Sequence, residues 1–522
     1  MPDQYDAIVI GSGFGGAVTA CRLAEAGYSV LVLERGRRWD KATFPRKPGD
    51  PWLWDQSHPE LLNGWIDFRV FPHMAVVQGA GVGGGSLIYA NICVNAKPDT
   101  FEAGWPPEIT YDALEPYYRT VKEMLRAQPV PESQWPERTR LLKLAAERTG
   151  AAHRFEPLDL AVRFSEGWHP GLPDAYSPAH SKQFQNEHGK MQGTCVHLGN
   201  CDIGCDVGAR NSLDLNYLAR AESRGAEVRS LHIARVIEPV ADAYQVRFER
   251  IEEGRLIAGR ASARIVVLAA GSLGSTDLLL RCRDQHRTLP RLSAFLGRNW
   301  SSNGDFLTPA IHPLRQVQPT RGPTITAAVN YLDGARDGKR FFIEDGGFPD
   351  LVQNWLAGVA EGGSRQPVVR ELINTIRFAL TGTGTAKHLM PWFAQGRDAA
   401  NGMLSLRAGR LFLDWDIRES EKTIEAIIET HKELAASTGG LPLVSPTWTV
   451  TRYLVTPHPL GGCNMGRSAS DGVVDHAGEV FGYPNLYVAD GAIVPESIGL
   501  NPSKTIAALA ERNAAIIVEE RR

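Results

Sequence analysis

The first 34 residues carry a pattern that few folds accommodate. An apolar run from Ala7 to Ile10 leads directly into a Gly-x-Gly-x-x-Gly motif, and a helix rich in small residues follows. A second apolar run, Val30 to Leu33, ends at Glu34, 23 residues after Gly11. This spacing predicts a βαβ unit in which a pyrophosphate approaches the backbone at the helix N-terminus and a carboxylate meets the ribose hydroxyls. The stretch therefore predicts a dinucleotide site and leaves NAD and FAD open.

Size and composition exclude several function classes. A chain of 522 residues, with 43% hydrophobic and 22% charged residues, predicts two or three domains with ordinary cores. A net charge of −3 gives no electrostatic basis for binding nucleic acid or an anionic membrane. No apolar run has the length of a membrane span, no signal peptide is visible, and the seven cysteines are scattered and odd in number. We therefore expect a cytoplasmic protein with reduced thiols, no nucleic-acid partner and no transmembrane segment.

Two stretches follow the first unit. Residues 37–73 are rich in Trp, Pro and Asp without a clear period, which is typical of either a lid over a site or a packed irregular wrap. Residues 78–91 hold five glycines within seven residues. Such density brings backbone rather than side chains against a neighbour, and it favours a second contact with the cofactor.

Hydrophobic periodicity predicts the remaining elements. Helical spacing indicates helices at 114–125, 141–148, 211–224 and 424–434, while residues 152–194 lack a pattern. Strands are expected at Val228 and at 233–237, and residues 244–250 and 255–261 are expected to form a meander. The apolar run 265–270 predicts a strand of a parallel sheet. Alternation over 411–417 predicts a half-buried antiparallel strand. Residues 301–455 thus form a separate layer of antiparallel sheet and helices, of the kind that builds pockets for organic substrates.

Three cysteines and a histidine lie close together in Cys195-Val-His-Leu-Gly-Asn-Cys201-Asp-Ile-Gly-Cys205. Three thiolates and an imidazole are a known zinc set, but this spacing is not a standard one. We favour a compact glycine-bearing loop with packed thiols and predict no metal.

The C-terminal segment completes a set of motifs. It contains His458-Pro-Leu-Gly-Gly-Cys463, Tyr487-Val-Ala-Asp-Gly491 and Asn501-Pro502, the last leading into a helix. Together with the first glycine motif, the 81–87 loop, Gly271–Thr276 and Gly297–Gly304, they resemble the glucose–methanol–choline (GMC) oxidoreductases and, within them, the cholesterol oxidase-like branch. The resemblance implies FAD as the cofactor and an α/β plus α+β architecture, in which a Rossmann-type FAD-binding domain joins an antiparallel-sheet-plus-helices substrate domain.

The resemblance also implies how the chain is divided. The FAD-binding domain would be discontinuous, with residues 1–40, 74–100, 194–300 and 456–522. Residues 41–73 would form the lid or excursion, and residues 101–193 and 301–455 the substrate-binding domain.

Cofactor contacts follow from the same resemblance. Glu34 would hold the adenosine ribose, Gly13 and Phe14 the pyrophosphate, and Val236 the adenine through its backbone. The 83–91 loop would line the isoalloxazine ring, Asp490 and Gly491 would reach the pyrophosphate or ribityl end, and Pro502 would lie at the pyrimidine side. The full implied set is Gly11, Gly13, Phe14, Gly15, Gly16, Glu34, Gly83, Gly84, Gly85, Ser86, Asn91, Val236, Gly271, Asp490, Gly491, Asn501 and Pro502.

The resemblance implies a catalytic pair, His458 and Asn501. Alcohol oxidation releases a hydride, here to flavin N5, and a proton, for which histidine is a suitable acceptor near neutral pH. Asn501 would fix the orientation of the substrate oxygen. We expect oxidation of a hydrophobic, steroid- or terpenoid-like secondary alcohol to a ketone, with O2 or another electron acceptor.

Two features leave alternatives open. The resemblance implies a substrate-domain glutamate that shifts the steroid double bond in cholesterol oxidases, within the sequence Gly-Leu-Glu-Thr-Trp. This sequence is missing here, and the roughly corresponding stretch is Lys387-His388-Leu389-Met390-Pro391-Trp392. Coupled isomerisation and cholesterol as the substrate are therefore not predicted, and His388 is the substitute considered in this stretch. A redox-neutral or reductive flavoenzyme (isomerase, desaturase or enone reductase) is the alternative, and a non-catalytic flavin-binding protein the least favoured. Covalent FAD attachment at His73 is possible in principle, but a plain loop histidine is favoured.

Overall fold

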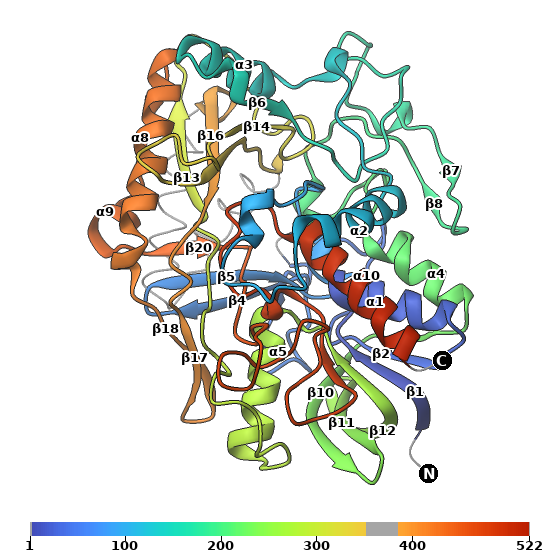
Figure 1. Cartoon of the computed structure of the whole chain (residues 1–522). Coiled ribbons are helices and arrows are strands. Elements are labelled where there is room, and N and C mark those ends of the chain that lie inside the picture. The colour runs from blue at the N-terminus through green and yellow to red at the C-terminus, as the bar shows by residue number, and fades with distance from the viewer. Residues whose placement is uncertain (1–2, 48, 351–384, 521–522) are drawn as a thin grey trace.

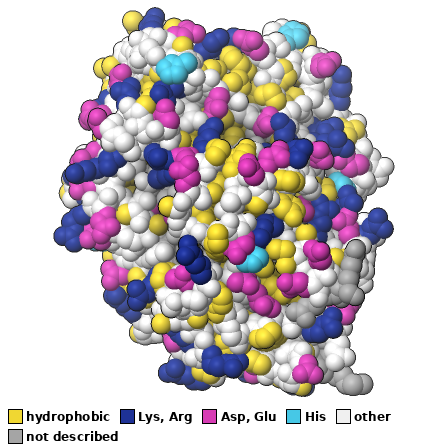
Figure 2. Space-filling view, viewed as in Figure 1, with side chains coloured by type: hydrophobic (Ala, Val, Ile, Leu, Met, Phe, Trp, Pro, Cys, Tyr) yellow, Lys and Arg dark blue, Asp and Glu magenta, His cyan; other side chains and the backbone are white. Residues whose placement is uncertain are grey.

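A computed structural model describes residues 3–47, 49–350 and 385–520. Two large sheets organise these residues, one toward the bottom of Figure 1 and the other toward the top. On the face shown in Figure 2, basic and acidic side chains are interspersed rather than gathered into one patch of a single sign.

The first sheet confirms the predicted dinucleotide fold. Its strand order is β10-β11-β12-β1-β2-β9, with β21 also pairing β12. The pairs of β1 with β12 and β2, of β2 with β9 and of β12 with β21 are parallel. Its strands are β1 (Asp3–Ile10), β2 (Val30–Leu33), β9 (Glu227–Arg229), β10 (His232–Val240), β11 (Ala243–Glu252), β12 (Arg255–Leu268) and β21 (Leu486–Val488).

Helices of small residues pack beside this sheet. The α1 helix contacts both α10 and α4, and α10 also contacts α2. Alanines and two glycines among the buried residues of α1 allow these close approaches. The helices are α1 (Phe14–Glu25), α2 (Tyr111–Met124), α4 (Tyr217–Ser223), α5 (Gly271–Leu280) and α10 (Ser503–Glu520).

The second sheet confirms the predicted antiparallel layer. Its order is β19-β13-β16-β15-β14-β6, with every pair antiparallel. The α8 helix contacts β13, β15, β16 and β19, and α3 contacts β14 and β15. The elements are β6 (Phe155–Pro157), β13 (Phe306–Ile311), β14 (Ala327–Asn330), β15 (Phe341–Asp345), β16 (Leu389–Gly396), β19 (Leu441–Pro442), α3 (Glu137–Arg148) and α8 (Glu421–Ser437).

A third sheet corrects the expectation for residues 37–73. The segment supplies β3 (Leu53–Trp54) and β4 (Ile66–Phe71), which join β5 (Met74–Gly79) and β20 (Leu454–Thr456). Trp65 is fully buried. The strand alternation was hidden because β4 mixes a buried Asp67 and a partly buried Arg69 with apolar residues. Of the two alternatives for this segment, a packed wrap describes it better than a surface excursion.

Three further elements differ from the sequence expectation. The meander strand and the buried parallel strand are one continuous strand, β12, because no turn interrupts residues 255–268. The helix expected at 211–224 is broken at Asn216 into a short 3₁₀ turn and α4. The strand expected at 411–417 is β18 (Arg410–Asp414), which pairs with β17 (Met403–Arg407), and a 3₁₀ turn begins at Ile417. The remaining short elements are β7 (Phe184–Gln185), β8 (Met191–Gln192) and α9 (Pro446–Thr451).

Within the described ranges, no helix combines the length and the apolar character needed to cross a membrane. The domain boundaries and the cytoplasmic location stay predictions.

Candidate active site

One cavity of about 710 Å³ lies between the first sheet and the second. Both ends of the chain contribute to it. Its lining includes the following predicted residues: Gly11, Gly13, Phe14, Gly15, Glu34, Gly84, Gly85, Gly271, Asp490, Gly491, Asn501, Pro502 and His458. The structure thus brings together two motifs that are more than 400 residues apart in the sequence.

The floor of the cavity is backbone. A Cβ on Gly15 would lie 1.5 Å from the Ala489 carbonyl oxygen, so α1 can start here only with glycine. Gly84 has φ +53°, and a Cβ there would lie 2.6 Å from Gly13 Cα. On the open side, a Cβ on Gly85 would meet no atom within 4 Å and one on Gly13 only Gly84 Cα at 3.9 Å. The two glycine segments therefore cross and leave a bare surface at the N-terminus of α1.

Two buried carboxyl groups are held at this floor. Glu34 follows β2, and its carboxylate accepts hydrogen bonds from Ser12 N (3.0 Å), Ser12 Oγ (2.6 Å) and Gly36 N (2.9 Å). Asp490 follows β21 and accepts from Gly271 N (2.8 Å), Ser275 Oγ (2.6 Å) and Ala492 N (2.8 Å). Burial raises the pKa of Asp490. These bonds fix both carboxyl groups at the carboxyl ends of strands, where α/β sheets bind their ligands.

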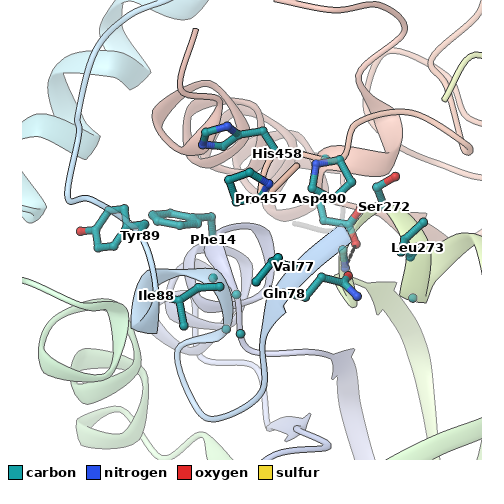
Figure 3. A pocket seen from close by; sticks show the side chains of 18 of the residues that line it. Phe14, Val77, Gln78, Ile88, Tyr89, Ser272, Leu273, Pro457, His458 and Asp490 are labelled. Carbon is teal, nitrogen blue, oxygen red and sulfur yellow. Dashed lines mark hydrogen bonds between the residues drawn. The ribbon is translucent and has the colours of Figure 1, made fainter. Parts of the chain in front are cut away.

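His458 enters from the opposite side, directly after β20 and Pro457 (Figure 3). Its Nδ1 lies 2.8 Å from Oδ1 of Asp305, which is fully buried at the start of β13. Thr456 supports both residues, because its hydroxyl oxygen accepts a hydrogen bond from His458 N (2.8 Å) and it also contacts the Asp305 carboxylate. Burial raises the pKa of Asp305, and His458 opposes that rise. With Nδ1 facing Asp305, Nε2 is the nitrogen left for a ligand in the cavity.

Asn501 lines the cavity from the turn before α10. The turn is held by Asn303, whose amide donates to the Leu500 carbonyl (2.8 Å) and whose Oδ1 accepts from Gly499 N (2.8 Å). No described residue hydrogen-bonds the buried Oδ1 of Asn501. A buried, unsatisfied acceptor in a cavity wall is suited to a ligand.

A buried glutamate lies beside Asn501. Glu344, on β15, is fully buried, and its Oε2 accepts a hydrogen bond from Gln395 Nε2 (2.9 Å). Burial raises its pKa well above the ordinary range, while the amides of Gln395 and Asn501 oppose the rise. The structure thus places a glutamate beside Asn501, although the Gly-Leu-Glu-Thr-Trp setting is absent from the sequence. The glutamate stands in a different local sequence, Phe341-Phe-Ile-Glu-Asp345, from the one sought.

Comparisons with known proteins agree with this geometry. Models of the GMC oxidoreductase family match residues 179–299 and 392–510, and a model of an NAD(P)-binding Rossmann-like domain matches residues 9–39. A cholesterol oxidase of Acinetobacter baumannii is 30% identical over 98% of this chain and 94% of its own length. The chain belongs to the GMC oxidoreductase family.

Two further comparisons extend the result. A cholesterol oxidase of Mycobacterium tuberculosis is 31% identical over 99% of this chain and 91% of its own. Pyridoxine 4-oxidase from Mesorbium loti has a solved structure that matches with a TM-score of 0.64 at 16% identity, over 98% of both chains. The latter shows a shared fold alone. As a GMC oxidoreductase, the protein is an FAD-dependent enzyme that acts on CH–OH donors.

The cavity of this GMC oxidoreductase fits FAD. Open backbone at Gly13 and Gly85 leaves room for a pyrophosphate, α1 directs its N-terminus there, and Glu34 is placed for ribose hydroxyls. Phe14 and Tyr89 meet edge to face, with ring centroids 5.4 Å apart, on one side of the cavity (Figure 3).

Some implied cofactor residues lie behind the wall rather than in it. Val236 is buried in the core, and β10 lines the cavity through Ile233, Ala234 and Arg235 instead. A register shift between Ala234 and Val236 moves the expected contact along the strand. Gly16, Gly83, Ser86 and Asn91 do not line the cavity and support it from behind. For example, Asn91 Oδ1 accepts from Arg210 Nε at 2.7 Å.

The other histidines that the sequence analysis considered do not line the cavity. His388 faces the backbone carbonyls of His312 and Arg315 through Nδ1 and does not line the cavity. His73 is exposed in the turn between β4 and β5. His197 stacks on Trp168, with ring centroids 3.9 Å apart, and among the described residues no group of His, Cys, Asp and Glu is arranged to hold a metal.

Asp305 and Glu344 are the candidate site residues that the sequence analysis did not include. Asp305 follows Gly304, the end of a matched motif, and that adjacency is the only sequence signal for it. Nothing in the local sequence marks Glu344.

Proposed function

We propose that this GMC oxidoreductase oxidises a hydrophobic, steroid- or terpenoid-like secondary alcohol to a ketone. The observation that carries the proposal is the His458–Asp305 pair, which leaves Nε2 for a ligand in the cavity that Asn501 also lines. The wall around it is apolar, with Leu307, Ile325, Phe348, Pro391 and Phe393. The cholesterol oxidases among the relatives support a substrate of this size and polarity.

Each polar side chain at the cavity has a separate role in this proposed reaction. Bound FAD supplies the two-electron acceptor for the hydride of the alcohol carbon. Nε2 of His458 takes the hydroxyl proton, and the Asp305 carboxylate stabilises the resulting imidazolium. The Asn501 amide donates a hydrogen bond through Nδ2 to the substrate oxygen and so fixes which hydrogen faces the acceptor. Apolar side chains exclude water from the reacting atoms.

Product analysis tests this function. The holoenzyme is incubated in air with cholesterol, other 3-hydroxysteroids, monoterpene alcohols and simple sugars. We expect one hydrophobic secondary alcohol to yield a ketone with two hydrogens fewer. Turnover of sugars alone, or a product of unchanged mass, would contradict the proposal.

Glu344 favours a second activity on the same substrate, the shift of a double bond in a β,γ-unsaturated ketone. Its carboxyl group is buried beside Asn501, behind the residues that line the cavity, and in its ionised form such a group can take a proton from one carbon and return it to another. Resemblance to cholesterol oxidases supports the same role.

Glu344→Gln is therefore expected to separate the two activities. With a 3β-hydroxy-5-ene steroid, the variant should form the unconjugated ketone while isomerisation slows by about 10²- to 10⁴-fold. Ultraviolet absorption of the conjugated enone and mass spectrometry follow the two steps. Glu156→Gln, at a partly exposed glutamate on β6, is the control and should leave both rates unchanged. Equal loss of oxidation and isomerisation in Glu344→Gln would contradict this assignment.

A further inference from the structure

A second polar feature lies in the cavity wall. Asp202 lines the cavity from the 3₁₀ turn Cys201–Ile203, and Thr324 and Ile325 line it from the segment before β14. The Thr324 hydroxyl donates a hydrogen bond to Asp202 Oδ1 (3.1 Å). Among the residues that the structure describes, none hydrogen-bonds both this pair and either His458 or Asn501. The pair is thus separate from the catalytic groups but open to the same cavity.

The carboxylate of Asp202 lacks the partners that a buried charge ordinarily has. No described residue hydrogen-bonds its Oδ2, and it forms no ion pair with a described residue. Two arginines lie near enough to act on it electrostatically, but neither forms a hydrogen bond or an ion pair with it. Arg138 binds the carbonyls of Thr324, Gly346 and Pro323, and Arg210 binds Asn91 and the Leu87 carbonyl. A carboxylate left unpaired in a wall costs stability, which points to a role in binding.

Charge and burial define the ligand chemistry. Burial raises the pKa of Asp202 to about 6, so the group remains ionised and accepts hydrogen bonds at neutral pH. The positive field of Arg138 and Arg210 disfavours an ammonium group at this position. A neutral donor, an alcohol hydroxyl, meets both conditions.

We propose that Asp202 and Thr324 form a polar subsite that binds a second hydroxyl group of the substrate, remote from the carbon that is oxidised. The proposal rests on the proposed oxidation of a hydrophobic alcohol and narrows its substrate to a diol-like molecule. The subsite selects strongly, because an analogue that lacks the hydroxyl leaves the carboxylate desolvated without a partner.

Ligand binding tests the subsite independently of turnover. The holoenzyme carrying His458→Ala is titrated with 3β-hydroxysteroids that have either no other polar group or a second hydroxyl on ring B, C or D. The flavin difference spectrum gives each Kd. One second-hydroxyl position should tighten Kd by roughly 10- to 100-fold, as expected for a hydrogen bond to a charged group. This scan of rigid positions also reports where the subsite lies.

Variants assign the effect to the named residues. Asp202→Leu should abolish the preference, and Asp202→Asn and Thr324→Val should reduce it while keeping the shape of the wall. Asp206→Asn is the matched control, because Asp206 lies in the same loop, pairs with Arg46 and does not line the cavity. It should keep the full preference.

Several outcomes overturn the subsite. These are equal Kd values for all steroids, a preference that survives Asp202→Leu, loss of FAD from Asp202→Leu and Asp202→Asn, and absence of steroid binding. Failure of the proposed oxidation shows itself differently. In that case the wild-type enzyme forms no ketone from any member of the set, whatever the pattern of Kd values.

Discussion

Replacing His458 by alanine is expected to leave FAD bound and to slow alcohol oxidation by about 10²- to 10⁴-fold, the usual contribution of a positioned proton acceptor. The side chain lines the cavity and contacts Asp305 through Nδ1, so its loss removes the acceptor without disturbing the glycine floor. Anaerobic stopped-flow measurement of flavin reduction gives the rate, and the absorption spectrum of the purified variant gives the FAD content. His458→Gln, which fills more of the volume, should show a similar loss.

The exposed His73 provides the matched control. His73→Ala should reduce its flavin at the wild-type rate, and denaturation should release FAD from both proteins, because nothing in the turn between β4 and β5 places His73 in the cavity. A His458→Ala enzyme that retains full activity would remove His458 from the mechanism.

Asp305→Asn is expected to have the second large effect, a fall in the rate of flavin reduction of roughly 10²- to 10⁴-fold. The carboxylate accepts from Nδ1 at 2.8 Å, which fixes the tautomer with a free Nε2 lone pair. An amide at this position can donate to Nδ1 instead, and the proton then moves to Nε2, where it blocks the acceptor. Stopped-flow flavin reduction over a range of pH checks this result.

A double variant shows whether Asp305 acts by orienting His458 or by stabilising the fold in general. Because Asp305 acts through His458, the combination His458→Ala with Asp305→Asn should be no slower than His458→Ala alone. Asp398→Asn is the control for loss of a carboxylate, since Asp398 is partly buried, bonds Ser301 and Ser302 and does not line the cavity. It is expected to lower stability and to leave the rate of flavin reduction nearly unchanged. Fully additive rate losses in the double variant would refute the coupling.

The sequence predicts those parts of the fold that are encoded locally. The βαβ unit ending at Glu34 and the crossing glycine loop were predictable, because strand, glycines, helix and acid follow one another within short spacings. The C-terminal motif placed His458 and Asn501 for the same reason. In contrast, β4 was missed because its charged residues obscure the alternation.

The predictions failed where long-range pairing decides the contact. Asp305 meets His458 across 153 positions, and Glu344 reaches Gln395 only because β15 pairs with β16. Val236 does not line the cavity because the pairing of β10 with β11 is irregular between Ala234 and Val236. No residue type in the strand indicates this irregularity. Such contacts follow from register between distant strands, whereas periodicity describes only the segment itself.

The most direct test of the account is an anaerobic titration of the oxidised holoenzyme with the alcohol panel, followed by readmission of air. We predict that one hydrophobic secondary alcohol bleaches the flavin stoichiometrically and that the bleaching lasts until an acceptor is supplied. Prompt return of the colour in air would identify O2 as that acceptor, and slow return would identify a dehydrogenase. If no alcohol bleaches a flavin that dithionite still reduces, or if product forms without bleaching, the central claim of net alcohol oxidation is contradicted.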